Sequence, residues 1–389
     1  MSPTAAPSAP AKPAAASLAG MSPGRIYNFS AGPGCLPEEV LKQIQQDVWN
    51  VGGSGVGILE HSHRGKVVDK IFEECEADIR KLANIPSNYK VLFLTGGASA
   101  QNHMIPMNWM KPGTTADYLV TGNWSQKTFD QAVKFSGKQG FGTAHLAVTS
   151  QDKNHSYIPA DSQIKYSPKP AYIHYCSNNT LYGTEWFRVP ATPVGVPLIC
   201  DASSHFYSRP LDFTKFAMVY AGAQKNMGPA GVTLCIVRDD LIEAGSKDIA
   251  DLLQYRSYVP ELSRPNTPPV FAVYVMGLIA KWIARQGGLA TMQKHNEAKA
   301  KFIYDVLDAT KFYDPHARPD SRSLMNITFR LPSDVLTDKF VKEALAQGLD
   351  GLKGHRNVGG IRASVYNAFP KEGCKALADF MREFEKKNG

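Results

Sequence analysis

The chain has 389 residues, a formal net charge of +8, 43% hydrophobic residues and 20% charged residues. This length allows two domains with a sizeable core, and the composition is ordinary for a soluble globular protein. The chain has no apolar stretch near the roughly 20 residues that cross a bilayer, and its basic residues are dispersed, so we expect neither a membrane protein nor a nucleic-acid-binding protein.

Residues 1–24 consist mainly of proline, alanine and serine, and we expect them to form a disordered tail. Such a segment cannot bury enough apolar surface to offset the entropy that ordering would cost. It lacks the continuous apolar stretch of a signal peptide. A transit peptide would be richer in arginine, so that interpretation is weak, although it stays open.

From residue 25 onward, apolar patterns with helical spacing alternate with short apolar runs typical of buried strands. Strands separated by helix-length segments indicate an α/β fold with a mostly parallel sheet and helices on both of its faces. The predicted helices cover 40–48, 66–82 and 125–135. The predicted strands cover 90–95, 118–121, 171–176, 196–200, 216–220 and 232–237.

The last part of the chain predicts a smaller α+β domain. After Asn266-Thr-Pro-Pro269 we expect a long helix through Trp282, then a strand and two helices. These elements are predicted at 324–331, 336–346 and 372–384. We therefore expect a large ligand-binding domain over 38–294, and a small domain made of 25–37 and 295–389.

Six cysteines occur without any Cys-x-x-Cys pair, and three of them, Cys176, Cys200 and Cys235, lie inside predicted strands. A free cysteine in such a run behaves as a small hydrophobic residue. This pattern favours a reducing compartment over a disulfide framework, so we expect the protein in the cytoplasm.

Lys225 follows the apolar run 216–220 and precedes a Gly-Pro-Ala-Gly turn. An ammonium at the end of a core strand is costly to desolvate, so its pKa falls and the free amine becomes nucleophilic. A lysine that reaches out of a strand end is the commoner case. Asp201, directly after the run 196–200, favours chemistry, because an aspartate and a Schiff-base lysine are what a protein contributes to pyridoxal phosphate catalysis.

Two more features follow predicted strands, where ligands of open α/β sheets bind. Gly96-Gly-Ala-Ser99 offers close backbone approach and free N–H groups to a phosphate, although many strand-to-helix turns are rich in glycine for geometry alone. Trp124 is placed to stack on an aromatic ring, and core packing is an equally good explanation. Together with Asp201 and Lys225, they predict one pyridoxal phosphate site.

Basic clusters occur early, at His61-Ser-His63-Arg64-Gly-Lys66, and late, from Lys353 to Arg362. The early histidines have no third ligand at a familiar spacing, so no metal is expected. A P-loop is excluded because Val67 stands where Ser or Thr is required. Arginine forks match the oxygens of phosphate and carboxylate, so an anionic substrate is favoured, while a solvated basic loop remains an alternative for Lys353.

Five motifs occur in a consistent order: Asn28-Phe-Ser-Ala-Gly-Pro33, Ser62-His-Arg-Gly-Lys66, Tyr220-Ala-Gly-Ala-Gln-Lys-Asn226 with Gly228-Pro-Ala-Gly231, Asn266-Thr-Pro-Pro269, and Lys353-Gly-His-Arg356. With them the chain, from about Tyr27 to its end, resembles the phosphoserine aminotransferases, pyridoxal phosphate enzymes of the class V group. The resemblance implies the fold type I of these transferases, with a seven-stranded-type sheet. It also implies reversible amino transfer from L-glutamate to 3-phosphohydroxypyruvate, giving O-phospho-L-serine and 2-oxoglutarate.

The resemblance further implies roles for single residues. Lys225 would form the Schiff base and then act as general base, Asp201 would pair with the pyridine nitrogen, and Trp124 would stack on the ring. The residues implied around the cofactor phosphate are Ala98, Ser99, Ser203 and Gln224, with Thr180 near the ring hydroxyl. Asn266 and Thr267 would reach the cofactor phosphate of a neighbouring subunit, which implies a homodimer with shared sites.

For the substrate, the resemblance implies that Arg362 binds the α-carboxylate. The residues implied to grip the substrate phosphate are His63, Arg64, His355 and Arg356. Some bacterial members carry an arginine at the position of Ser99, so this chain has one cation fewer for that phosphate. Whether 4-phosphohydroxythreonine, used in pyridoxine biosynthesis, is a second physiological substrate stays open.

Two other functions compete with this prediction. A cysteine desulfurase needs a nucleophilic cysteine on a mobile loop, and the contexts of Cys35 and Cys374, the loop-like candidates, give no such signal. A non-catalytic anion-binding protein of the same fold is disfavoured because both Lys225 and Asp201 are present.

Overall fold

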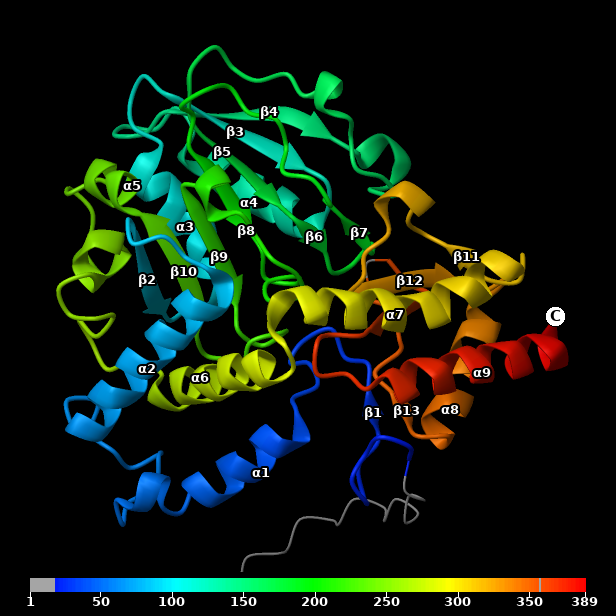
Figure 1. Cartoon of the computed structure of the whole chain (residues 1–389). Coiled ribbons are helices and arrows are strands. Elements are labelled where there is room, and N and C mark those ends of the chain that lie inside the picture. The colour runs from blue at the N-terminus through cyan, green and yellow to red at the C-terminus, as the bar shows by residue number, and fades with distance from the viewer. Residues whose placement is uncertain (1–17, 357) are drawn as a thin grey trace, which may run out of the picture.

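The structure, a computed structural model, describes residues 18–356 and 358–389. Its centre is a seven-stranded sheet in which every neighbouring pair is parallel except the two pairs that β10 makes (Figure 1). In spatial order the strands are β2 (Tyr89–Leu94), β10 (Thr233–Arg238), β9 (Met218–Gly222), β8 (Leu198–Asp201), β5 (Pro170–Cys176), β3 (Thr115–Val120) and β4 (Thr143–Thr149). The predicted α/β fold with a mostly parallel sheet is confirmed.

Helices cover both faces of this sheet. The cluster on one face includes α2 (Lys66–Ala83) and α6 (Val270–Arg285), and the cluster on the other includes α3 (Gly97–Trp109). In α2, the buried residues Val68, Phe72, Cys75 and Ile79 recur every three to four positions, which gives the helix one apolar stripe. Among the described residues, none of the helices is long and apolar enough to cross a bilayer.

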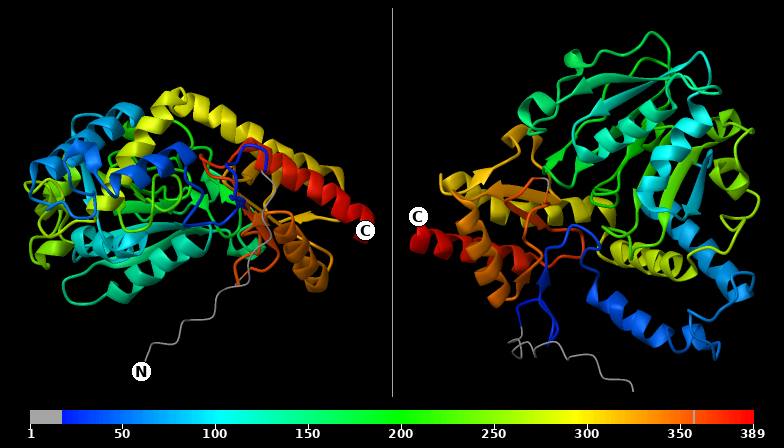
Figure 2. Two further views of the ribbon diagram at one scale, coloured as in Figure 1. Left: turned by 90° about the horizontal axis from the view of Figure 1, so that it is seen from below. Right: turned by 180° about the vertical axis from the view of Figure 1, so that it is seen from behind.

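A smaller unit lies at one end of this sheet (Figure 2). It contains a second hydrophobic core, around a three-stranded antiparallel sheet, to which the N-terminal segment contributes Tyr27 and Phe29. Its elements are β1 (Tyr27–Asn28), α7 (Gly288–Ala309), β11 (Asp314–Pro315), β12 (Asn326–Arg330), α8 (Asp334–Ala346), β13 (Leu349–Asp350), β14 (Ile361–Ser364) and α9 (Lys371–Asn388).

The elements that the sequence prediction missed include α7, β4 and β14. The helix α7 begins at Gly288; Gly287 and Gly288 adopt positive φ of 95° and 75°, which separates α7 from the preceding helix. Its stripe of buried residues is interrupted by the buried polar Asn296 and Lys299, which blurs the helical pattern. The edge strand β4 is only partly buried and therefore shows no apolar run.

The predicted disordered tail is wrong in its last part. Residues 18–24 pack on the smaller unit: Leu18 and Met21 contact its core, and the Ala19 carbonyl accepts a hydrogen bond of 2.6 Å from the Tyr27 hydroxyl. The Ser22 amide donates to Glu38, the first residue of α1 (Glu38–Asp47). Leu18 and Met21 thus give this short polar stretch enough apolar contact to hold it. Residues 1–17, the rest of the predicted tail, lie outside the described residues.

All six cysteines are buried free thiols. Burial raises the pKa of Cys200 and of Cys374 to about 12, and that of Cys35 also lies above its usual range. Thiols in this state are poor nucleophiles and act as small hydrophobic side chains.

Candidate active site

The amine of Lys225 lies at the carboxyl end of the central strands. The loop between β9 and β10 carries this residue, and the hydrogen bond from Ala223 N to Val232 O (3.1 Å) closes the loop. Lys225 is only 9% exposed, and its Nζ lies 2.8 Å from Thr180 Oγ1 and 2.7 Å from Ser204 Oγ. Burial lowers the pKa of this amine, and the negative charge of Asp201 opposes part of that effect.

Asp201 ends β8 and is buried. Its Oδ1 accepts hydrogen bonds from Ser203 N at 2.9 Å and Ser203 Oγ at 2.6 Å. The same hydroxyl accepts a bond of 3.1 Å from Gly222 N at the end of β9, which ties the two strand ends together. Burial raises the pKa of the Asp201 carboxyl, and the hydrogen bonds from Ser203 and the charge of Lys225 oppose that rise. A cationic N–H partner would stabilise the ionised form further.

Trp124 lies in the first turn of α4 (Asn123–Phe135). The Nζ atoms of Lys225 and Lys127 lie 6.0 Å and 4.7 Å from the centroid of its ring. The indole Nε1 is buried and has no hydrogen-bond partner within the described residues. The ring therefore stands at the strand ends with a donor still available.

The predicted phosphate-binding turn opens α3. Gly96 and Gly97 take positive φ of 85° and 65°, which L-residues rarely adopt, and Ala98 and Ser99 follow in the first helical turn. The helix packs against β9, after which comes the half-buried Gln224. An N-terminus of this kind offers free backbone N–H groups to an anion.

These groups fit pyridoxal phosphate. A buried carboxylate that gains from a cationic partner, a buried amine with a lowered pKa and an indole with a free donor surround one site, with the start of α3 beside it. The site predicted around Lys225, Asp201 and Trp124 thus has the chemistry that this cofactor requires.

Arg362 lies on β14, opposite Thr328 of β12, and its buried Nε has no hydrogen-bond partner in the described part of the chain. Its positive charge contributes, after burial, to the lowered pKa of Lys225. Burial also lowers the pKa of His355, helped by the charges of Arg362, Arg356 and Lys127. Three basic residues, Arg362, Arg356 and Lys127, therefore lie within electrostatic range of His355, and Arg362 also influences Lys225.

Arg356 is exposed and lines a cavity of about 490 Å³ together with Arg330 and the start of α8. His63 and Arg64 line a different cavity of about 230 Å³, and His63 lines a third, of about 420 Å³, with Thr267. Among the described residues, no hydrogen bond or ion pair joins these side chains or that of Asn266 to Lys225.

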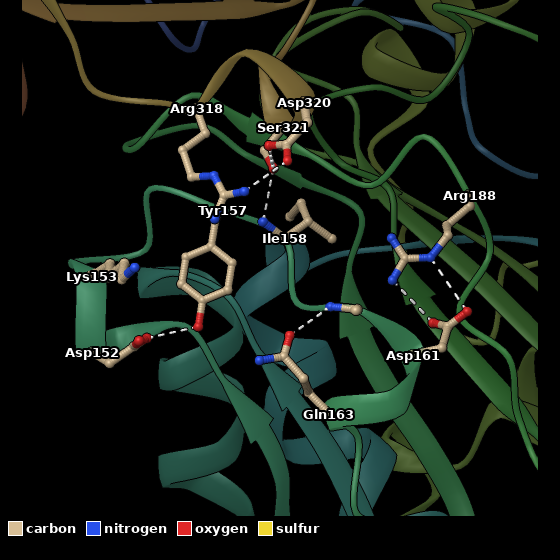
Figure 3. A pocket seen from close by; sticks show the side chains of 11 residues that line it. Asp152, Lys153, Tyr157, Ile158, Asp161, Gln163, Arg188, Arg318, Asp320 and Ser321 are labelled. Carbon is tan, nitrogen blue, oxygen red and sulfur yellow. Dashed lines mark hydrogen bonds and ion pairs between the residues drawn. The ribbon is translucent and has the colours of Figure 1, made fainter.

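A cavity of about 540 Å³ lies apart from this site, where the segment 152–163 meets residues 318–321 (Figure 3). Its two arginines are each paired with an aspartate: Arg188 with Asp161 at 3.1 Å and Arg318 with Asp320 at 3.0 Å. Both arginine charges of this cavity therefore already have partners.

Sequence reasoning missed two residues of the site, Ser204 and Lys127. Ser204 is three residues after Asp201, so the same strand end delivers both, and this proximity was a usable signal. Lys127 is three residues after Trp124, and because α4 begins at Asn123, before the predicted start of the helix at residue 125, both lie on one helix face.

Comparisons with known proteins agree with this geometry. The family model described as aminotransferase class-V matches residues 26–377. The chain is 46% identical to a phosphoserine aminotransferase of Herpetosiphon aurantiacus and 48% identical to one of Lysinibacillus sphaericus, each over 94% of this chain and 99% of the relative. Among solved structures it resembles the phosphoserine aminotransferase of Bacillus circulans subsp. alkalophilus, with a TM-score of 0.90, 45% identity and coverage of 94% of this chain and 99% of that one. It also resembles a pyridoxal-phosphate-bound phosphoserine aminotransferase of Trichomonas vaginalis, with a TM-score of 0.88, 38% identity and coverage of 92% and 100%.

Proposed function

Because the chain belongs to the class-V aminotransferases and, within them, to the phosphoserine aminotransferases, we propose that Lys225, Asp201 and Arg362 carry out its amino transfer. The reaction moves the amino group of L-glutamate to 3-phosphohydroxypyruvate, and it gives O-phospho-L-serine and 2-oxoglutarate. The single observation that carries this assignment is the buried amine of Lys225 at the strand ends, where it is hydrogen-bonded to Thr180 and Ser204. The charge of Asp201 raises the pKa of this amine, and the charge of Arg362 lowers it.

Pyridoxal phosphate, when bound, supplies an electron sink that makes the Cα proton of the amino acid acidic. Asp201 would hold a proton on the ring nitrogen, because its buried carboxylate is stabilised by a cation. Trp124 would support the ring, and Thr180 would lie near its hydroxyl. The residues that would hold the cofactor phosphate are Ala98, Ser99, Ser203 and Gln224.

Lys225 would move the proton between the substrate Cα and the cofactor. A general base works best when its pKa lies near the working pH, and burial shifts the pKa of this amine downward in that direction. The amine of Lys225 and the hydroxyls of Thr180 and Ser204 are shielded from water, which limits exchange of the transferred proton with solvent.

Arg362 would bind the α-carboxylate of both substrates, because its buried Nε has no other partner and two parallel N–H groups match a carboxylate. His355 and Arg356 would bind the phosphate of the keto acid and the γ-carboxylate of glutamate. A bound dianion would counteract the neighbouring charges that contribute to the lowered pKa of His355.

We further propose a homodimer in which one subunit lends residues to the site of the other. His63, Arg64, Asn266 and Thr267 are the lent residues; they would reach the substrate phosphate and the cofactor phosphate. Support comes from the absence, among the described residues, of any hydrogen bond or ion pair between their side chains and Lys225 in the same chain, and from the cavity that His63 and Thr267 share. Exposed apolar side chains also surround this region, with Trp49 85%, Leu59 63% and Leu262 51% exposed. In Figure 1, α1 and the segment after it stand away from the sheet, as an element does when a partner packs against it.

A cytoplasmic location is proposed because all six cysteines are free and buried, which suits a reducing compartment. Serine biosynthesis follows from the reaction. Participation in pyridoxine biosynthesis is a separate question, and a coupled assay that compares 3-phosphohydroxypyruvate with the keto acid of 4-phosphohydroxythreonine answers it.

The assignment is tested by Lys225→Ala. The purified wild-type protein should be yellow, should bleach with borohydride, and should then carry the cofactor on the peptide with Lys225. The variant should show neither the trapped peptide nor glutamate-dependent activity above about 10⁻³ of wild type. Lys301→Ala, which changes an exposed lysine of α7, should behave as wild type. Full activity in Lys225→Ala would refute the assignment.

A further inference from the structure

The side chains of Lys225, Thr180 and Ser204 form a closed triangle. The amine lies 2.7 Å from Ser204 Oγ and 2.8 Å from Thr180 Oγ1, and the two hydroxyls also hydrogen-bond to each other. Ser204 and Thr180 are each 3% exposed. Within the described residues, the Ser204 hydroxyl has no hydrogen-bond partner besides these two. The hydroxyl of Ser204 therefore hydrogen-bonds only to Lys225 and Thr180 within this part of the chain.

We propose that Ser204 is a positioning residue of the transamination: together with Thr180 it binds two N–H groups of the free Lys225 amine and thereby turns the nitrogen lone pair toward the substrate Cα. This inference rests on the proposed function, in which Lys225 is the base. It assigns to Ser204 a role that acts through Lys225 rather than through contact with substrate.

The argument follows from the bonding of an amine. A neutral primary amine has two N–H bonds and one lone pair in a roughly tetrahedral arrangement. When both N–H bonds donate to Ser204 and Thr180, the direction of the lone pair is fixed, and it lies away from both hydroxyls. When the lone pair takes the proton from Cα, it becomes the third N–H bond, while the electrons of the broken C–H bond stay on the carbon side. The two hydrogen bonds need not be broken in either direction of the transfer.

Neutral partners suit this task better than charged ones. A second carboxylate in place of the hydroxyls would hold the amine in its protonated form, because an opposite charge nearby raises the pKa of an amine. The hydroxyls orient the amine and shift its pKa less than a carboxylate would, so burial and the charge of Asp201 remain the main influences on its protonation. Orientation of a reacting group is worth a large part of a catalytic effect even when binding is unchanged.

Both hydroxyls are held by separate parts of the fold. The carbonyl of Ser204 accepts a bond of 3.3 Å from the side chain of Asn226, the neighbour of Lys225. Thr180 follows β6 (Asn178–Asn179), where the Asn179 side chain donates to the Thr121 carbonyl at the end of β3 at 2.7 Å. The triangle thus joins three strand ends of the large sheet, so the amine is oriented by the scaffold and not by one flexible loop.

The test uses the holoenzyme with Ser204→Ala. We expect kcat to fall about 10-fold to 100-fold while KM for glutamate stays within about twofold, because binding groups are untouched. The deuterium isotope effect with α-deuterated glutamate should rise, because proton transfer becomes slower relative to the other steps. Ser204→Thr keeps the hydroxyl and should regain most of the lost kcat. Ser208→Ala removes a buried serine hydroxyl of the same segment and should leave kcat unchanged.

A second readout does not depend on turnover. The enzyme is first treated with glutamate, which frees the lysine, and is then labelled with acetic anhydride at a series of pH values; the acetylated Lys225 peptide is quantified by mass spectrometry. The ammonium loses one hydrogen-bond acceptor in Ser204→Ala, so the labelling midpoint should move down by about one pH unit. Thr180→Val removes the other hydroxyl while keeping the shape of the side chain, and it should also move the labelling midpoint down. If Ser204→Ala does not fold, this variant still tests the proposal.

An unchanged kcat and an unchanged labelling midpoint in Ser204→Ala would overturn the proposal, and so would a loss confined to KM. If the wild-type enzyme shows no glutamate-dependent amino transfer, the proposed function fails instead. In that case the cofactor-free protein is labelled without glutamate, and its midpoint still reports whether the hydroxyls bind the amine.

Discussion

In the proposed function, single side chains at the ends of β8 and β9 carry the chemistry. Lys225, Asp201 and Trp124 were found from the sequence because polar or aromatic residues directly after apolar strands face the usual ligand edge of a sheet. The basic clusters that contain His63 and Arg356 predicted an anionic substrate, but the group that each residue binds came from resemblance alone, because no local pattern says which distant loops meet. Ser204 was missed although it is close to Asp201 in the sequence, because its hydrogen bonds to Lys225 and Thr180 form only when the ends of β6, β8 and β9 come together.

Asp201→Asn tests the charge at the strand end. The amide keeps the size of the side chain but no longer stabilises a cation, so kcat should fall by about 10³-fold or more. The loss of its negative charge should also lower the pKa of Lys225 further, because that charge opposes the effect of burial. Both are measured, as kcat and as the labelling midpoint of the freed amine.

The control for this variant is Asp212→Asn. Asp212 makes the same local turn as Asp201, accepting from the amide and hydroxyl of Thr214 at 3.0 Å and 2.6 Å, but it lies at the surface. It should keep full activity. Equal losses in the two variants would mean that the turn, and not the charge at the strand end, is what matters.

Arg362→Ala and Arg356→Ala separate the two anion sites. We expect the first to lower kcat/KM for glutamate and for the phosphorylated keto acid alike, because both carry an α-carboxylate. The second should harm the phosphorylated substrate more. A lost charged hydrogen bond costs about 1.5–3 kcal/mol, or roughly 10-fold to 150-fold in kcat/KM. Steady-state assays with each substrate check this, and identical profiles for the two variants would contradict the assignment.

At the scale of elements, the position of Arg362 depends on how β14 continues. Lys299 of α7 is buried, and its Nζ donates to the carbonyls of Val365, Tyr366 and Asn367 at 3.1, 2.6 and 3.4 Å. It thereby fastens the turn after β14 to a helix of the same unit. Neither α7 nor Lys299 was identified from the sequence. The apolar pattern of this helix is weak, and in the sequence a buried lysine looks the same as an exposed lysine.

Lys299→Met should destabilise the protein in a way that depends on pH. Burial lowers the pKa of Lys299 from its usual 10.5 to about 8, so protonation is disfavoured in the folded state. Below pH 8 this cost is fully present in the wild type; as pH rises above 8 the folded state releases the proton before the unfolded state does, and the cost fades. The advantage of wild type over Lys299→Met should therefore widen by about 1–2 kcal/mol between pH 7 and pH 9.5.

Urea unfolding at several pH values measures this difference. Lys301→Met, on the exposed side of α7, should change the free energy of unfolding by no more than about 0.5 kcal/mol at every pH. The thiols of Cys374 and Cys35 oppose the effect of burial on the pKa of Lys299, so Cys374→Ala in the same background tests whether a thiol contributes to the pH dependence. A gap that narrows with rising pH would contradict the assignment.

The position of β9 shows why a sequence pattern predicts the existence of a strand better than its first and last residues. The run 216–220 predicted a strand, and the structure has it at Met218–Gly222. Phe216 and Ala217 are buried although they lie outside the ladder, so the apolar run begins before the strand does. Hydrophobicity reports burial, whereas a strand is defined by its hydrogen bonds.

At the scale of the whole molecule, two cores are joined by segments from both ends of the chain. The core of the smaller unit combines Tyr27, Phe29 and Cys35 with residues from 300 to 384. This supports, as a proposal, the division into a large domain over 38–294 and a small domain made of 25–37 and 295–389. The two units also meet where the Ile158 amide donates to Ser321 Oγ at 3.0 Å, beside the cavity of Figure 3.

The proposed dimer is tested by Trp49→Glu. A charge in place of an 85% exposed tryptophan should weaken an interface there by about 2 kcal/mol or more, and so raise the dimer dissociation constant at least about 30-fold. Activity should fall in parallel with the dimer, because each site needs residues from its neighbour. Val194→Glu, at a fully exposed apolar residue elsewhere, should change neither. Analytical ultracentrifugation across a dilution series measures the mass, and a fully active monomer would refute the shared site.

The six buried thiols have a practical consequence. Cys75 and Cys200 lie in one core of the large sheet, Cys235 lies in the other, and Cys35 and Cys374 lie in the smaller unit. A thiol reagent can reach each of them only when the region around it opens. The rate at which an alkylating agent modifies each cysteine, measured peptide by peptide, would therefore report how often each core opens locally, with no engineered probe.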